Sequence, residues 1–137
     1  MAVEFIRQPH GLGAPLGMYS HVSLGRGNLV AVAGQVGMDA QGNLAGSDLE
    51  SQARQAYENL GIALSSVGCG YADVLKMTTY LVSADLIAEF MRARSEIFAE
   101  LCPTGDYPPN TLVIVSRLVE PELLFEVEAL AIAPTAR

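Results

Sequence analysis

The sequence predicts an α+β fold in which two amphipathic helices pack on one face of a single sheet of about six strands. Two segments repeat apolar residues every three or four positions, which is the spacing of an amphipathic helix. Short runs of apolar and β-branched residues precede, separate and follow these segments, and such runs are typical of strands. The order of strands, helix, strand, helix and strands suits one sheet covered on one side.

The N-terminal third is predicted to contain three strands. Residues 3–6 form a short apolar segment, and a loop rich in Gly and Pro follows it. Residues 21–24 and 29–36 are apolar runs on either side of a Gly- and Asn-containing turn, so they predict a β-hairpin. Residues 38–46 are polar, carry three turn signals and predict a loop.

The first helix is predicted to begin at a capping box. Ser47 and Glu50 have the spacing at which the two side chains bind the first free N–H groups of a helix. Gly68 fits its C-terminal end. We expect its buried stripe to comprise Leu49, Ala53, Ala56, Tyr57, Leu60, Leu64 and Val67.

Residues 74–82 are predicted to form a strand and residues 85–101 the second helix, which Pro103 ends. The expected buried face of this helix consists of Leu86, Phe90, Ile97, Phe98 and Leu101.

The last quarter, residues 107–133, is predicted to form two strands joined by a turn. Pro108 and Pro109 hold the entry extended, and residues 111–115 are a β-branched run. Glu, Pro and Glu at residues 120–122 supply the turn, and residues 123–133 form the second strand.

Two carboxylates are expected to share one face of this last strand, because side chains alternate along a strand. An apolar neighbourhood raises the proton affinity of a carboxylate, which suits general acid or base catalysis near neutral pH. Alternatively, these glutamates face solvent or pair with a basic side chain. The residues of this face are Leu124, Glu126, Glu128, Leu130 and Ile132.

Composition indicates one domain of 137 residues, since half of the residues are hydrophobic. Fifteen acidic against eight basic residues give a net charge of −7, which argues against nucleic acid as the main partner. The mean hydropathy of +0.30 suggests apolar surface covered in an oligomer. The sequence has neither a signal-like segment at its N-terminus nor an apolar run of about eighteen residues, so we expect a cytosolic protein without a membrane partner.

The cysteines and histidines show no ligand-like spacing. Cys69 and Cys102 are far from His10 and His21 in the sequence. A structural zinc site needs about four such ligands in pairs, so we predict none. We expect both cysteines to be packing residues rather than nucleophiles.

Several sequence blocks in one order resemble the RidA/YjgF family of small proteins. They cover nearly the whole chain and comprise residues 17–20, 27–30, 33–36, 52–60, 73–78 and 125–129. The resemblance implies a chorismate-mutase-like fold and a homotrimer with three clefts between subunits. It also implies hydrolysis of reactive enamines and imines by attack of water on a C=N bond, in a cleft that binds a small molecule without a metal or organic cofactor.

The resemblance also assigns site residues. Glu126 matches the glutamate that positions the attacking water, and Tyr19 matches a tyrosine at the cleft. Gly34 matches a glycine where backbone approaches the ligand, and Tyr80 matches an aromatic residue of the pocket wall. His21 stands where many members carry glutamine, and it shares a face with Tyr19 if this segment is extended.

One position departs from the family pattern. The family arginine that clamps the substrate carboxylate lies in a Pro-x-Arg-Ser motif, and Asn110 and Thr111 stand at its last two positions here. An amide supplies neither the charge of a guanidinium nor its two parallel N–H donors. Replacing arginine by asparagine should therefore weaken the binding free energy for a carboxylate by on the order of 2–5 kcal/mol. Asn110 and Thr111 are therefore predicted to contact a substrate other than a simple 2-imino acid. Arg117 is a less favoured replacement for the clamp.

Each of these assignments has an alternative. Glu126 can instead pair with a basic residue of a neighbouring subunit, and Tyr19 and His21 can be interface residues. Asn110 can cap the backbone after the two prolines. The whole protein can then be a non-catalytic trimer that binds a metabolite or a partner protein, and a ribonuclease role suits this acidic chain least.

Overall fold

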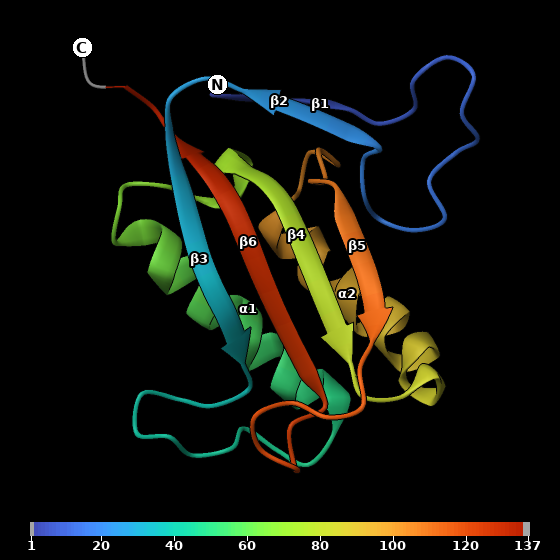
Figure 1. Cartoon of the computed structure of the whole chain (residues 1–137), viewed down its shortest axis with the longest axis vertical. Helices are drawn as coiled ribbons and strands as arrows, with labels where there is room; N and C mark the ends of the chain where they lie inside the picture. The colour runs from blue at the N-terminus through green and yellow to red at the C-terminus, as the bar shows by residue number, and fades with distance from the viewer. Residues whose placement is uncertain (1, 136–137) are drawn as a thin grey trace.

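The computed structural model describes residues 2–135 and confirms the α+β prediction, with both helices packed on one face of a mixed sheet (Figure 1). In chain order the elements are β1 (Val3–Ile6), β2 (Val22–Gly25), β3 (Asn28–Val36), α1 (Leu49–Ser65), the short 3-10 helix η1 (Tyr71–Asp73), β4 (Val74–Leu81), a second 3-10 helix η2 (Ala84–Leu86), α2 (Ile87–Leu101), β5 (Asn110–Ile114) and β6 (Phe125–Ala133).

The strands form two sheets, so the prediction of a single six-stranded sheet is wrong. The main sheet has the order β3-β6-β4-β5, in which β6 is antiparallel to both of its neighbours and β4 is parallel to β5. Strands β1 and β2 pair only with each other and cross one end of the main sheet (Figure 1). The Ser23 hydroxyl donates a hydrogen bond to the Leu75 carbonyl, 2.5 Å away, and ties β2 to β4.

The predicted hairpin of residues 21–24 and 29–36 is also wrong, because its two strands are not neighbours in a sheet. Strand β2 pairs with β1, and β3 pairs with β6. The connection between β2 and β3 contains Gly27, with φ of +144°, and a side chain there would collide with the Ala133 carbonyl at the end of β6. Strand β5 lies at the edge of the main sheet, next to β4. Because β4 and β5 are parallel, helix α2 forms the crossover between them. Strand β6, the last in the chain, lies in the centre of the sheet between β3 and β4.

Helix α1 begins one residue later than the capping box predicts. Asp48 is the N-cap, and its carboxylate accepts a hydrogen bond from the Ser51 N–H at 2.9 Å. Glu50 does not close a capping box and instead forms ion pairs with Arg54 and Arg92, both at 3.2 Å. Helix α2 begins at Ile87, two residues after the predicted start, because η2 occupies the preceding turn.

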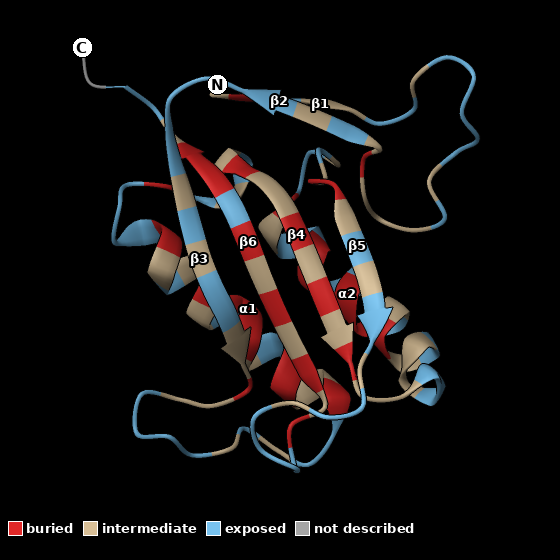
Figure 2. Ribbon diagram, viewed as in Figure 1, coloured by how far each residue is buried: buried red, intermediate tan, exposed pale blue. Residues whose placement is uncertain are grey.

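The core lies between the helices and the covered face of the sheet. The predicted stripe of α1 is buried except for Val67, which follows the end of the helix and is exposed. Along β6 and β4, buried residues alternate with less buried ones (Figure 2). Phe125, Val127, Ala129 and Ala131 are buried on the face of β6 that meets the helices. The opposite face is not covered by a helix, and only Ile132 at the end of the strand is buried on it.

A buried amide joins two loops to the start of α1. Gln52 is fully buried, and its Nε2 donates hydrogen bonds to the carbonyls of Gly46 at 3.0 Å and Glu122 at 3.1 Å. Its Oε1 accepts a hydrogen bond from the Leu124 N–H at 2.8 Å. One side chain therefore fixes the loop before α1 and the loop that leads into β6.

We predict that Gln52→Leu lowers the free energy of unfolding by at least about 2 kcal/mol, because it leaves buried backbone groups without partners. Denaturant unfolding measures this change, and Gln41→Leu in an exposed loop is the control, with an expected change within about 0.5 kcal/mol. Equal stability of the two variants would contradict the role of the Gln52 amide.

Candidate functional site

The uncovered face of the sheet brings together two carboxylates and a phenol from adjacent strands. Tyr80 of β4 is the cross-strand partner of Glu126 in β6, and Thr78 is the partner of Glu128. The Tyr80 hydroxyl donates a hydrogen bond to Glu128 Oε1 at 2.5 Å. Because cross-strand partners share a face, the central strand places both glutamates beside Tyr80.

The protonation of the Glu126 carboxyl group is shifted towards the acid form. Burial raises the pKa of Glu126 above its ordinary value, and the negative charge of Glu128 adds to the increase. Its side chain is only partly buried, so solvent can still reach this face. The direction is the one that the apolar neighbours of the strand predict, and a carboxylate of this kind suits proton transfer.

Gly34 leaves room for this carboxylate. The pairing of β3 with β6 shifts register between Val32 and Gln35, and Gly34 lies within this irregular segment. A Cβ added to Gly34 would overlap Glu126 Oε2, so the glutamate side chain lies directly against the glycine backbone. The structure thus brings Gly34, Tyr80 and Glu126 of the predicted site together.

Lys76 and Thr111 extend this group towards the sheet edge. Lys76 Nζ donates a hydrogen bond to Thr111 Oγ1 at 2.9 Å and to the Met77 carbonyl at 3.1 Å. Burial lowers the pKa of Lys76, and the charge of Glu128 opposes this decrease. Lys76 was not predicted, although its alternation with Tyr80 in β4 is a signal that places both residues on one face.

Tyr19 and Asn110 lie elsewhere, on the helix-covered side of the sheet edge. They line a cavity of about 300 Å³ between α2 and β5, closed by the loop that precedes β2. The other lining residues are Leu16, Gly17, Ile87, Met91, Arg94 and Leu112. Asn110 Oδ1 accepts a hydrogen bond from the buried Thr79 hydroxyl at 2.8 Å, so its amide points to this side. The predicted site residues therefore form two groups.

His21 belongs to the loop around this cavity. Its ring lies edge-on to the ring of Tyr19, with centroids 5.9 Å apart, and its Nε2 is 2.8 Å from the Gly13 carbonyl. The Tyr19 hydroxyl accepts a hydrogen bond from the Leu16 N–H at 3.1 Å. These contacts hold the loop closed on itself.

Sequence reasoning missed Arg94, which lies in the wall of this cavity and is 3% exposed. It stands between Phe90 and Ile97 in the apolar stripe of α2, and a charged residue within such a stripe is the signal that was available. Arg117, the less favoured clamp, instead donates to the carbonyls of Leu118 and Val119 in its own loop.

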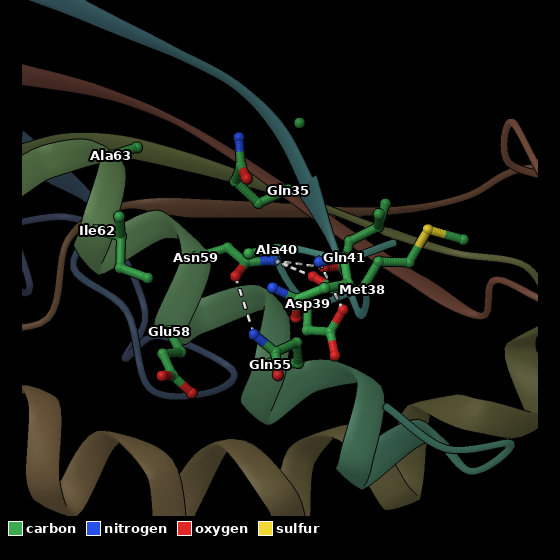
Figure 3. Close-up of a pocket in the computed structure, with 12 residues that line it drawn as sticks. Gln35, Met38, Asp39, Ala40, Gln41, Gln55, Glu58, Asn59, Ile62 and Ala63 are labelled. Atoms are coloured by element: carbon green, nitrogen blue, oxygen red, sulfur yellow. Dashed lines mark hydrogen bonds between the residues drawn. The ribbon is translucent and has the colours of Figure 1, made fainter. Parts of the chain in front are cut away.

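A larger hollow of about 660 Å³ lies between α1 and the edge strand β3. Figure 3 shows the amides of Gln55 and Asn59 facing the loop that contains Met38. The Asn59 amide nitrogen donates to the carbonyls of Val36 and Met38, and Gln55 donates to Asn59. Because these amides already bind the backbone of residues 36 and 38, their role is to fix the loop after β3, and they do not indicate a ligand in this hollow.

Residues 2–135 contain neither a metal-binding cluster nor a membrane-spanning helix. Within this part of the chain, no three His, Cys, Asp or Glu side chains gather in a way that could hold a metal ion. Of the helices described here, none has the length and apolar composition to cross a membrane.

The chain is similar in sequence to one family of small proteins and to its members. The sequence model of the Endoribonuclease L-PSP family matches residues 11–133. A RutC family protein of Pyrococcus horikoshii is 34% identical over 118 residues, which are 85% of this chain and 88% of that protein. A Salmonella typhimurium protein named 2-iminobutanoate/2-iminopropanoate deaminase is 27% identical over 106 residues, which are 77% of this chain and 80% of that protein.

Solved structures agree with this result. A Rid family protein of unknown function from Yersinia pestis, YyfB, superimposes with a TM-score of 0.84 at 30% identity, over 97% of this chain and 100% of that one. Escherichia coli TdcF with bound serine gives a TM-score of 0.70 at 26% identity, over 97% and 98% of the two chains.

We predict that Glu128→Gln lowers the pKa of Glu126, because it removes the neighbouring negative charge that disfavours ionisation. The pKa should stay above the ordinary value, since burial remains. Titration of the Glu126 side-chain carbonyl by ¹³C NMR measures the change, with Glu122→Gln in an exposed loop as the control. An unchanged pKa in Glu128→Gln would show that the two carboxylates do not interact.

Proposed function

The chain belongs to the RidA/YjgF family, which the Endoribonuclease L-PSP sequence model describes, and from this we propose that it is a small-molecule hydrolase of the imine/enamine deaminase type. The observation that carries the proposal is the partly buried Glu126 carboxyl, whose pKa is raised and which lies against Gly34. The name of the Salmonella typhimurium relative supports the same reaction class.

In the proposed reaction, water attacks the carbon of a C=N bond while Glu126 accepts one proton from that water. The C=N electron pair moves to nitrogen, which takes up a proton, and a carbinolamine forms. Collapse of the carbinolamine expels ammonia and leaves a C=O bond. The sum is imine plus water to carbonyl compound plus ammonia, so Glu126 only carries protons between the steps.

Asn110 limits the proposed substrate. It stands where the family motif has the clamp arginine, and its neutral amide cannot balance the charge of a carboxylate. We therefore propose that the natural substrate is not a simple 2-imino acid. The same observation favours a second candidate function, a trimer that binds a metabolite or a partner protein without catalysis.

We further propose that the uncovered sheet face joins copies of this chain in a homotrimer with clefts between subunits. Leu29, Leu130 and Val113 lie on this face and are 67%, 39% and 37% exposed. Apolar side chains gathered on one face favour burial against another copy. Such packing would also bring the face that carries Glu126 into a cleft with fewer water molecules.

Ammonia release tests the proposed reaction. With 2-iminopropionate generated in solution, we predict slow turnover by the native chain and faster turnover by Asn110→Arg, because the guanidinium supplies the missing clamp. Adding Glu126→Gln to this variant should reduce turnover about 100- to 10,000-fold, and adding Glu120→Gln, in an exposed loop, is the control. Full activity without Glu126 would exclude it as the proton carrier. Inactivity of both the native chain and Asn110→Arg would favour the binding protein.

Light scattering coupled to size exclusion tests the assembly. The native chain of 14.5 kDa should elute with about three times this mass, and Leu130→Lys should shift it towards the monomer, because a charge would be buried at the contact. Ile62→Lys is the control, since Ile62 is exposed on α1, away from this face. A monomeric native chain would contradict the trimer.

A further inference from the structure

The two central strands of the main sheet place three proton-bearing groups side by side on the uncovered face. Glu126 and Glu128 alternate with buried residues along β6, so their Cα atoms lie about 7 Å apart on the same face. Tyr80 of β4 is the direct cross-strand partner of Glu126. All three side chains are partly buried. Ionisable groups at this spacing affect each other's protonation.

Tyr80 reaches diagonally across the two strands to Glu128. Its hydroxyl donates a hydrogen bond to Glu128 Oε1 at 2.5 Å, although the direct cross-strand partner of Glu128 is Thr78. Diagonal neighbours on adjacent strands lie within reach of an aromatic side chain. The hydrogen bond to Glu128 raises the pKa of the Tyr80 hydroxyl, and burial and the charges of both carboxylates add to the increase. The phenol therefore keeps its proton, and remains a donor, over the pH range in which carboxyl groups titrate.

Glu126 is not anchored in this way. Its carboxyl lies against the Gly34 backbone, and it takes part in none of the side-chain hydrogen bonds and ion pairs within residues 2–135. It can therefore take up and release a proton without breaking a hydrogen bond of the protein. The fold gives the two glutamates different surroundings, and such a difference separates the roles of two neighbouring carboxyl groups.

Glu128 is the charge that acts on Glu126 from within the sheet. Strands β3 and β5 contain no ionisable side chain. The remaining charged group of β4 and β6 is Lys76, whose Nζ donates to Thr111 Oγ1 in β5 and to the Met77 carbonyl. Burial raises the pKa of Glu126, and the negative charge of Glu128 adds to the increase.

We propose that Tyr80 and Glu128 are positioning residues for the proton transfer by Glu126. Tyr80 holds the Glu128 carboxylate beside Glu126, and this fixed negative charge makes Glu126 a stronger proton acceptor. Glu126 exchanges the proton, and Glu128 keeps its charge and its place. The proposal rests on the hydrolysis proposed above and deepens it, because it names the residues that set the pH range in which Glu126 accepts a proton.

Titration of the Glu126 side-chain carbonyl by ¹³C NMR in single and double variants tests the proposal. Tyr80→Phe should lower the pKa of Glu126, because the Glu128 carboxylate loses its anchor and turns towards solvent. Adding Tyr80→Phe to Glu128→Gln should lower this pKa no further than Glu128→Gln alone, because no charge is left to hold in place. Tyr107→Phe is the matched control, since Tyr107 stacks on Phe98 of α2 and should leave the titration unchanged.

The pH profile of ammonia release is the second readout. In the Asn110→Arg chain, turnover should rise with pH as Glu126 ionises, because a base must lose its proton before it can accept one. A lower pKa of Glu126 moves this rise to lower pH. Tyr80→Phe and Glu128→Gln should therefore both shift the rise towards acid, and Tyr107→Phe should not. A purely structural defect would reduce turnover at every pH without moving the rise.

An unchanged pKa of Glu126 in a folded Tyr80→Phe chain would overturn the proposal. A pKa decrease in the double variant that equals the sum of the two single decreases would also overturn it, because Tyr80 would then act without Glu128. The titration needs no turnover, so a failure of this pair and a failure of the hydrolase can be told apart. The expected pKa changes without any ammonia release would support the pair and count against the proposed hydrolysis.

Discussion

The fold depends on one strand that is central to the sheet and covered on one side only. Strand β6 hydrogen-bonds to β3 and to β4, and it alone connects the two halves of the main sheet. Its alternation sends Phe125 and Val127 into the core beneath the helices and sends Glu126 and Glu128 to the uncovered face. The burial that stabilises the fold and the placement of the carboxylates are therefore two results of the same strand geometry, and a register slip of one residue would destroy both.

Local patterns predicted the elements but not their pairing. The stripe of α1, the extent of α2 and the two faces of β6 follow from periodicities of 3.6 and 2, which depend only on neighbours in the sequence. The predicted hairpin failed because its two strands pair elsewhere, β2 with β1 and β3 with β6 at the far end of the chain. The close packing of the Gly27 backbone against the Ala133 carbonyl at the end of β6 is one such contact, and it leaves no room for a side chain at position 27.

In the candidate site, too, features that depend on sequence neighbours could be predicted, and features that depend on distant contacts could not. The raised pKa of Glu126 could be predicted because its apolar neighbours belong to its own strand. The hydrogen bond from Lys76 to Thr111 joins two strands separated by a helix, so no local pattern contains it. The resemblance placed Asn110 and Glu126 in one cleft, whereas within this chain they occupy opposite sides of the sheet. Arg94 was visible in the sequence as a charge within an apolar stripe. That its buried Nε has no hydrogen-bond partner within residues 2–135 could be recognised only from the packed helix.

The irregular pairing around Gly34 has a consequence for the behaviour of this protein at high concentration. Strand β3 is an edge strand, and an edge with regular, unpaired N–H and C=O groups is a template on which another chain can add a strand and start a fibril. The register shift between Val32 and Gln35 interrupts this edge and increases its local twist. The glycine that makes room for the Glu126 carboxylate thus also lies where the edge on which another chain could add a strand is interrupted.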